Sequence, residues 1–341
     1  MPTTMNELWA MMESEIAEGK SDAAGWLIRL AQPKAGCPLF VALEVGSLRR
    51  AVLLRLPFAS VPAHRHWPRC RGLEPMALKF GSDEHFGVAL KDERFSDVFS
   101  SLSEDLVRRV SEATTPAEQS SAFLGQLARW QKFLTSSSEG LSEDMQRGLW
   151  GELYFLRTHL LPNLGLSAVA GWKGPERAAQ DFQFAAGAVE VKTTIAKQPQ
   201  VVRISSERQL DHTVCRKLIL HVIALEFRDG IGETLPELIT SLRSTMQTNV
   251  FMRDRLEDCL LLAGYVDAHA ARYADRGYVL RSESSLHVTD GFPALTEQGL
   301  PVGVCEVSYG LAVSSCDAFR MNSAELKHSM AGINSSPQQQ G

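Results

Sequence analysis

The apolar run "KLILHVIALEF" at residues 217–227 constrains the fold more than any other stretch of this chain. It is too short to cross a bilayer and is typical of a central strand that a sheet buries on both faces. Upstream, "QDFQF" and "VEVKTT" predict the two strands of a hairpin, and "QVVRIS" predicts a further strand. Helices are expected over "SEDMQRGLWGELYFLRTHLL" and from "SSERQLD", where serine is a common helix cap. The pattern predicts an α/β core, in a chain that is α+β overall, with a central mixed sheet flanked by helices.

The apolar patterns of the N-terminal part end at a polar stretch near residue 140, which predicts a domain boundary. Strand-length apolar runs separated by Gly, Pro and Ser occupy residues 24–92, and apolar stripes at helical spacing follow over 93–135. The polar stretch "TSSSEGLSED" then breaks the pattern. We expect four regions: an N-terminal β-rich and then helical region for substrate or partner contacts (1–140), a core that carries the chemistry (141–230), a helical and β extension (231–332), and a disordered tail (333–341).

Charge and cysteine content narrow the class of protein. The net charge of −5 excludes a basic nucleic-acid coat, although an enzyme can bind nucleic acid through one face and be acidic elsewhere. Residues 141–220 are less acidic, with ten Lys and Arg against eight Asp and Glu. The six cysteines form no CxxC pair, and the N-terminus has no apolar export signal. We expect a cytoplasmic protein with reduced thiols and no membrane partner.

The hairpin "AAQDFQFAAGAVEVKTT" (178–194) carries three charged side chains in its strands. With a turn over residues 185–188, Asp181 pairs with Lys192, and side-chain alternation places Asp181, Glu190 and Lys192 on one face. The other face collects four apolar residues, namely Phe182, Phe184, Val189 and Val191. A two-residue loop gives the same faces, whereas a three-residue loop splits both sets. Burial of the apolar set therefore favours a register that gathers the charges.

These charges indicate one of two things. Two carboxylates repel each other unless a cation joins them, and oxygen ligands of this kind suit Mg²⁺ or Mn²⁺. Lys192 could orient or deprotonate a metal-bound water, or stabilise charge on a phosphate. Together these are the groups needed for metal-assisted attack of water on a phosphodiester. The alternative is that the three residues are only the solvated face of a sheet.

Neighbouring residues favour the first interpretation. Gly148 and Gly151 lie in the predicted helix, where glycine costs about 1 kcal/mol relative to alanine, so we expect a close backbone approach there. Glu152, beside them, could point at the same cation or could be an exposed helix residue. Downstream, Ser205 and Gln209 lie where the expected helix begins, and its N–H groups could hold a phosphate or simply be capped.

A second motif, "AHRHWPRC" (63–70), places His64, His66 and Cys70 close together and invites a zinc interpretation. The spacing fits none of the common structural zinc sites, and no second Cys/His pair lies nearby in the sequence. We expect structural or surface roles for these residues.

The order of these elements resembles the PD-(D/E)XK, or restriction-endonuclease-like, superfamily. The match runs through a helix with Glu152, a strand with Asp181, a strand with "EVK", a helix with Gln209 and a buried strand, and is most specific over residues 141–226. In more detail the chain resembles bacterial PD-(D/E)XK motif proteins, which are often encoded in phage-defence or restriction-type gene neighbourhoods. The "PD" is not literal, because Gln180 precedes Asp181.

The resemblance implies roles for named residues. Asp181 and Glu190 would hold a divalent metal, with the carbonyl of Val191 as a further ligand, and Lys192 would position the attacking water. Glu152 matches the acidic residue that many members carry on the first helix, where it would add a ligand. Gln209 lies where several branches place a functional glutamine, but no tyrosine follows at the usual interval.

The resemblance also implies a fold and an activity. We expect a restriction-endonuclease-like core and a Mg²⁺- or Mn²⁺-dependent deoxyribonuclease, more an endonuclease than an exonuclease, that serves a restriction or phage-defence system. DNA would be its substrate, other defence subunits could be partners, and a homodimer would suit double-strand cleavage. The alternative is a non-catalytic subunit of the same fold that binds DNA or scaffolds a defence complex. Action on RNA by the same core is a third option.

Overall fold

The computed structural model describes residues 4–22, 25–32, 37–55, 70–80, 83–136 and 140–334. The chain divides into two compact units, Met1–Gly140 with Val266–Ala268, and Leu141–Tyr265 with His269–Gly341. His64 and His66, and the tail from residue 335, lie outside the described residues. No helix within the described ranges is long and apolar enough to cross a membrane.

The first unit combines a sheet with helices, as the alternating and then helical patterns predict. Its antiparallel sheet has the order β1-β2-β3-β5-β4. The strands are β1 (Trp26–Leu30), β2 (Leu39–Glu44), β3 (Arg50–Arg55), β4 (Leu73–Phe80) and β5 (Asp83–Leu90), and the helices are α1 (Met5–Ala17), α2 (Ser96–Ser111) and α3 (Pro116–Ser136). Both predicted helical stripes are buried, the first formed by Phe99, Leu102, Leu106 and Val110 and the second by Phe123, Leu127, Trp130 and Phe133.

The second unit is built on a mixed sheet in the order β10-β11-β9-β7-β6, with β13 paired to β11. Only β7 and β9 run parallel; the other pairs are antiparallel. The strands are β6 (Phe182–Phe184), β7 (Gly187–Thr194), β9 (Leu218–Asp229), β10 (Glu233–Thr234), β11 (Arg276–Val288) and β13 (Arg320–Met321). The apolar run at 217–227 forms β9, in the middle of the sheet, so the predicted α+β class with a central mixed sheet is confirmed.

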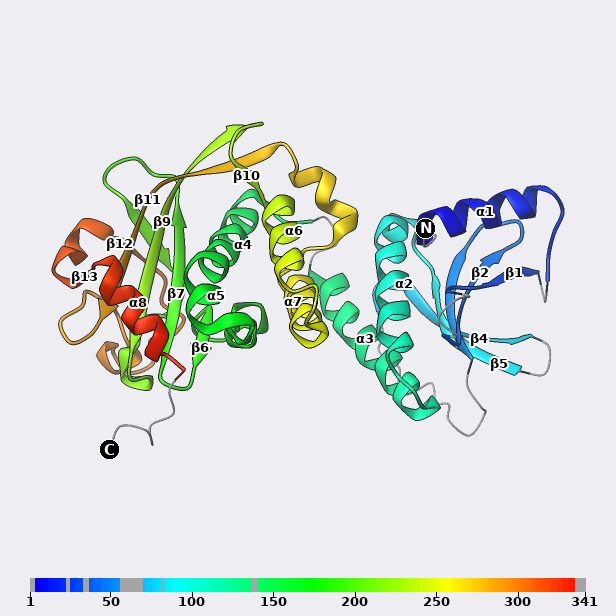
Figure 1. Cartoon of the computed structure of the whole chain (residues 1–341), viewed down its shortest axis with the longest axis horizontal. Coiled ribbons are helices and arrows are strands. Elements are labelled where there is room, and N and C mark those ends of the chain that lie inside the picture. Colours follow the sequence, from blue (N-terminus) through cyan, green and yellow to red (C-terminus); the bar gives the residue numbers. More distant parts are fainter. Residues whose placement is uncertain are drawn as a thin grey trace. The chain divides into compact units, whose positions relative to one another are not determined.

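Helices cover one face of this sheet, and a small second sheet lies on the other (Figure 1). The helices are α4 (Glu143–Phe155), which continues through a π-helical turn (Leu156–Leu160) into α5 (Leu161–Leu164), then α6 (Leu235–Thr245), α7 (Val250–Leu262) and α8 (Ser323–Gly332). The second sheet pairs β8 (Val201–Ile204) with β12 (Tyr309–Ala312). We call the two apolar clusters the helix-side core, which includes Phe155, Phe182 and Val191, and the β8-side core, which includes Ala188, Ile204 and Leu220.

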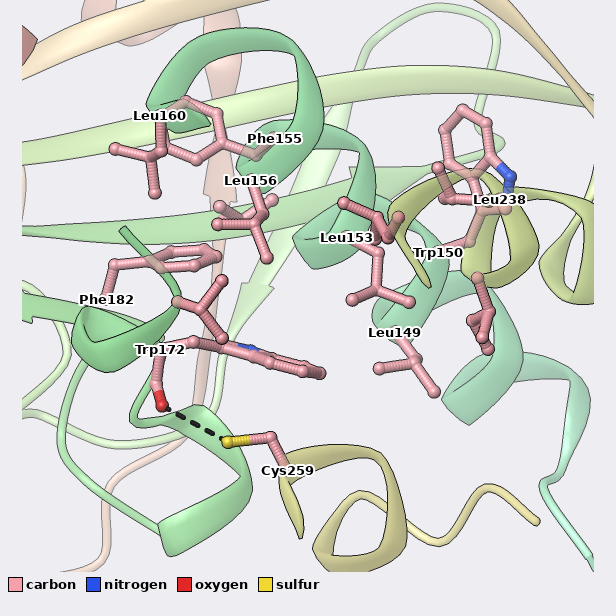
Figure 2. Close-up of a cluster of buried hydrophobic side chains, with 14 of the residues drawn as sticks. Leu149, Trp150, Leu153, Phe155, Leu156, Leu160, Trp172, Phe182, Leu238 and Cys259 are labelled. Carbon is pink, nitrogen blue, oxygen red and sulfur yellow. Dashed lines mark hydrogen bonds between the residues drawn. The ribbon is translucent and has the colours of Figure 1, made fainter. Parts of the chain in front are cut away.

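Helix α4 anchors the helix-side core and approaches the sheet closely. Figure 2 shows its residues Leu149, Trp150 and Leu153 packed among side chains of the cluster. A Cβ atom added at Gly151 would lie 2.3 Å from Cγ2 of Thr193 on β7, so this glycine permits the contact. The expectation of a close approach is therefore confirmed for Gly151. It is wrong for Gly148, where an added Cβ would meet nothing within 4 Å.

The hairpin has a shorter loop than the four-residue turn expected. Phe182 pairs with Val189 and Phe184 with Gly187, so the loop consists of Ala185 and Ala186. Continuing this register places Asp181 opposite Glu190 rather than Lys192. The apolar face is nevertheless the one predicted, because a two-residue loop keeps the same side-chain parity: Phe182, Val189 and Val191 belong to the helix-side core, and Phe184 packs against it.

Candidate active site

Asp181 takes its position from the shortness of β6. This strand has three residues, so Val191 on β7 has no strand partner on that side, and its N–H instead donates to Oδ2 of Asp181 at 2.8 Å. The N–H and C=O groups of one strand residue point to the same side, so the Val191 carbonyl also faces this open edge. The Asp181 carboxylate and the Val191 carbonyl are thus brought to one place by the end of a strand.

Glu190 and Lys192 project from β7 to the opposite face from Val191, and they form an ion pair. Nζ of Lys192 lies 2.6 Å from Oε1 of Glu190. The Glu190 side chain is 1% exposed, and its Oε2 has no hydrogen-bond partner among the described residues. A buried carboxylate oxygen without a donor is costly, which is a reason to expect a further cation beside it.

Glu152 reaches the same place from α4. Its Oε2 accepts a hydrogen bond from Nε1 of Trp172 at 2.7 Å. Trp172 is fully buried, and its carbonyl accepts hydrogen bonds from Arg255 (3.1 Å) and from the Cys259 thiol (3.8 Å) on α7, the second of which is the dashed line in Figure 2. The indole that orients Glu152 is thus held by a second helix.

Gly174 leaves open the space between two of the carboxylates. A Cβ added there would lie 2.9 Å from Oδ1 of Asp181 and 3.0 Å from Oε2 of Glu152. The backbone is held in place, because the N–H groups of Lys173 and Gly174 both donate to the carbonyl of Asp181, at 2.7 and 2.9 Å. Two carboxylate oxygens therefore face one small gap that any larger residue would fill.

The electrostatics of the site oppose the ionisation of all three carboxyl groups when no cation other than Lys192 is present. Burial, and then the charge of Asp181, raises the pKa of Glu190 from 4.5 to about 8, against the attraction of Lys192. Burial likewise raises the pKa of Asp181 and, helped by the Asp181 charge, the pKa of Glu152. Burial alone would lower the pKa of Lys192, but the carboxylates of Glu190 and Asp181 outweigh it and raise this pKa. Three carboxylates thus share one ammonium.

These residues fit a hard divalent cation. Asp181 and Glu152 are half-buried residues with a carboxylate oxygen each at the gap beside Gly174, and Oε2 of Glu190 has no hydrogen-bond partner among the described residues. Carboxylates and a backbone carbonyl are the oxygen ligands that Mg²⁺ and Mn²⁺ take, usually together with water and phosphate oxygens. Without a metal ion, the ammonium of Lys192 neutralises the carboxylate of Glu190. If a metal ion bound that carboxylate, the ammonium would be free to bind a water molecule or a phosphate oxygen.

The segment with Ser205 and Gln209 differs from its prediction. Residues 205–211 form a hydrogen-bonded turn and no helix. Oε1 of Gln209 accepts from the N–H of Ser205 at 2.8 Å, and Oε2 of Glu207 accepts from the N–H of Val307 at 2.9 Å. Because these contacts satisfy the segment locally and through a distant loop, no helix N-terminus is present to hold a phosphate.

A second cluster of titratable residues was not singled out by the sequence. His159, His221 and Glu283 have ligand atoms within 4.8 Å of one another, which is close enough for the three side chains to share a metal ion. One signal was available: His221 interrupts an otherwise apolar buried strand, and a buried polar side chain needs a partner. Its partners are far away in sequence and could not be found there.

Comparison with known proteins gives one match. The family described as "Putative PD-(D/E)XK family member (DUF4420)" matches residues 5–314, nearly the whole chain. Neither a curated protein nor a solved structure matches the chain significantly.

Proposed function

The chain belongs to the DUF4420 family of PD-(D/E)XK proteins, and from this premise we propose that it is a divalent-metal-dependent nuclease that hydrolyses DNA phosphodiester bonds. The observation that carries the proposal is the convergence of Glu152, Asp181 and Glu190 around one ammonium, beside a gap kept open by Gly174. A merely solvated sheet face would not bury Glu190 to 1% exposure.

Each residue has a role in this proposal. Asp181, Glu190 and the Val191 carbonyl hold Mg²⁺ or Mn²⁺, and Glu152 adds a ligand. When bound, such an ion neutralises charge on a phosphate and lowers the pKa of a water molecule. Lys192 orients the attacking water or holds a phosphate oxygen, since its ammonium lies 2.6 Å from the proposed ligand Glu190. Hydrolysis adds this water across one P–O bond and leaves a phosphate and a hydroxyl end.

The substrate and setting follow from the family resemblance. Duplex DNA in a restriction or phage-defence system is the proposed target, with endonuclease action. The Met1–Gly140 unit is proposed to contact substrate or partner subunits. A homodimer would cut both strands. Ser205 and Gln209 contribute, in this proposal, through the turn that they form and not through a helix N-terminus.

The test is a cleavage assay on supercoiled plasmid and on phage DNA, with Mg²⁺, Mn²⁺ or EDTA. We expect nicking that needs the metal and is lost in Asp181→Ala and in Lys192→Ala. The matched control is Asp317→Ala, which removes an exposed carboxylate that pairs with Arg320 and should cleave as wild type does. Equal cleavage by wild type and by both site variants would refute this site.

The alternative is a non-catalytic DNA-binding or scaffolding subunit. Two features of the sequence support it: the net charge of −5 and the absence of a basic stripe. It predicts DNA or partner binding that is the same in Mg²⁺ and in EDTA and unchanged in Glu190→Ala. Wild-type protein that binds DNA in this way and cleaves nothing with either metal would favour it over the nuclease.

A further inference from the structure

The helix-covered face of the sheet carries a cluster that the proposed nuclease does not use. His221 pairs with Val191 across the parallel β7–β9 ladder, and paired residues point to the same face. Val191 belongs to the helix-side core, and the ring of His221 lies 4.6 Å from that of Phe155 in the same core. Glu190 and Lys192 project to the other face, and the two clusters have no residue in common.

Three side chains converge on this face. Nε2 of His159 lies 3.1 Å from Oε2 of Glu283, and Nε2 of His221 lies 3.5 Å from the same oxygen. In a tetrahedral site with bonds of about 2.05 Å, neighbouring ligand atoms lie about 3.3 Å apart. The two observed separations bracket that value, and the third, between ring nitrogens of the two histidines, is within 4.8 Å.

His221 is buried and oriented by one partner, and its second ring nitrogen faces Glu283. It is 1% exposed, its Nδ1 lies 2.8 Å from Oγ of Ser285, and its Nε2 has no hydrogen-bond partner among the described residues. At 3.5 Å the Glu283 oxygen is too far for an ordinary hydrogen bond. Histidines that bind metals usually use one nitrogen and donate a hydrogen bond through the other, and Ser285 can accept that bond here.

Local irregularities of the backbone bring the other two residues into place. His159 lies in the π-helical turn between α4 and α5, a form that occurs mostly as single turns and often at functional sites. Glu283 follows a register shift in β11 between Leu280 and Ser282, and such bulges redirect side chains. Both deviations from regular structure therefore fall next to the same cluster.

The cluster opens into a pocket of about 400 Å³ lined by all three side chains, by Asn163 and by Lys327. His159 and Glu283 are 16% and 33% exposed, so the convergence point can be reached from this pocket. A site with three protein ligands and one open side is the arrangement in which zinc keeps a position for water or another small ligand.

We propose that His159, His221 and Glu283 form a second metal site, for a divalent transition metal ion of the zinc type, with its open position facing this pocket. Two imidazole nitrogens favour Zn²⁺, Co²⁺ or Ni²⁺ over Mg²⁺, which prefers oxygen ligands. The ion would tie the end of α4 to β9 and β11. The proposal is independent of the nuclease, because it shares no ligand with Asp181 and Glu190.

The test uses the full-length, tag-free protein, stripped with EDTA and dialysed, in a Cys305→Ser background because this exposed thiol could also bind metal. Co²⁺ is the probe, since its visible absorption reports coordination. We expect one equivalent to bind with tetrahedral-type bands, to be displaced by one equivalent of Zn²⁺, and not to be displaced by millimolar Mg²⁺.

Variants identify the ligands. His159→Ala and Glu283→Gln change partly exposed side chains and should each weaken Co²⁺ binding at least tenfold, and Ser285→Ala should weaken it about tenfold. Asp181→Ala should bind Co²⁺ as the parent does. The proposal is overturned if His159→Ala and Glu283→Gln bind like the parent, or if the parent binds no Co²⁺ at micromolar concentration, in which case the three residues are only a hydrogen-bonded ion pair with a neighbouring histidine.

Discussion

The two faces of the central sheet carry two different kinds of polar cluster. At the edge of the sheet and on its β8 side, the hairpin places the carboxylates of Asp181 and Glu190 near the ammonium of Lys192. A third carboxylate, that of Glu152, comes from α4. On the helix side, two imidazoles meet one carboxylate, and His159 and Glu283 are 124 residues apart. One sheet can thus support two kinds of metal site, one with oxygen ligands and one with imidazole nitrogen ligands. The two need share no ligand, because successive strand residues point to opposite faces.

The largest effect that separates the two sites is expected for Lys192→Ala. Loss of its ammonium should lower the rate of Mg²⁺-dependent cleavage by about 100- to 1000-fold, the range typical for removing one charged or polar group that acts on the transition state. Co²⁺ binding at His159 should not change. Initial rates of plasmid nicking and a Co²⁺ titration of the same preparation measure both, and a parallel loss of the two properties would mean that the sites are not independent.

Gly174→Ala tests whether the gap between the carboxylates matters. The new methyl group would lie about 3 Å from an oxygen of Asp181 and of Glu152, so it should compete with a metal there. We expect cleavage to fall about 10- to 100-fold, with partial recovery at higher Mg²⁺ or Mn²⁺. Gly148→Ala is the matched control, because its methyl group would meet nothing within 4 Å. Full activity in Gly174→Ala would place the metal elsewhere.

The hairpin cluster should destabilise the protein when no metal is bound. The pKa of Glu190 is about 8 in the fold against 4.5 in the unfolded chain, so the native state binds more protons between these values and stability falls as the pH rises from about 4.5 through 8. Glu190→Gln should reduce this fall, leaving the part due to Asp181 and Glu152, and stabilise the metal-free protein at pH 8.5 by about 1–3 kcal/mol. Urea unfolding in EDTA at pH 6 and 8.5 measures it; a variant less stable than wild type at pH 8.5 would contradict the raised pKa of Glu190.

The contact of α4 with the sheet is open to a similar test. Gly151→Ala would place a methyl group 2.3 Å from Cγ2 of Thr193, and we expect it to lower the free energy of unfolding by about 1–3 kcal/mol. Thr193→Ser in the same chain removes the opposing methyl group and should recover part of this loss. Chemical denaturation of the two variants and their combination measures the coupling, and additive effects would argue against a direct clash.

The smallest effect is expected for Gly148→Ala. This glycine lies inside α4 with free space around its Cα, so alanine should stabilise the helix by up to about 1 kcal/mol. Thermal unfolding should show a small rise in Tm, with unchanged cleavage and unchanged Co²⁺ binding. A loss of stability would reveal a role for this glycine that its surroundings do not show.

Much of the fold could be predicted because its signals are local. The buried run of β9, the helical stripes of the first unit and the two faces of the hairpin all follow from periodicities of about two and 3.6 residues. The hairpin loop has two residues, and this length gives the same faces as a four-residue turn because both preserve side-chain parity. The sequence predicts a helix from Ser205 because a pair of serines is typical of a helix cap, whereas the structure has a turn there. The contact of Glu207 with distant Val307 leaves no signal in the sequence.

By itself the sequence determined that Glu190 and Lys192 share a face of β7, since strand geometry alternates side chains regardless of what surrounds them. Only the tertiary structure decided that Asp181 meets the Val191 N–H, that Trp172 turns Glu152 toward the same gap, and that His159, His221 and Glu283 converge behind the sheet. The physical reason is range: periodicity acts over neighbouring residues, whereas these contacts depend on where β6 ends, how α4 packs, and where β11 shifts its register.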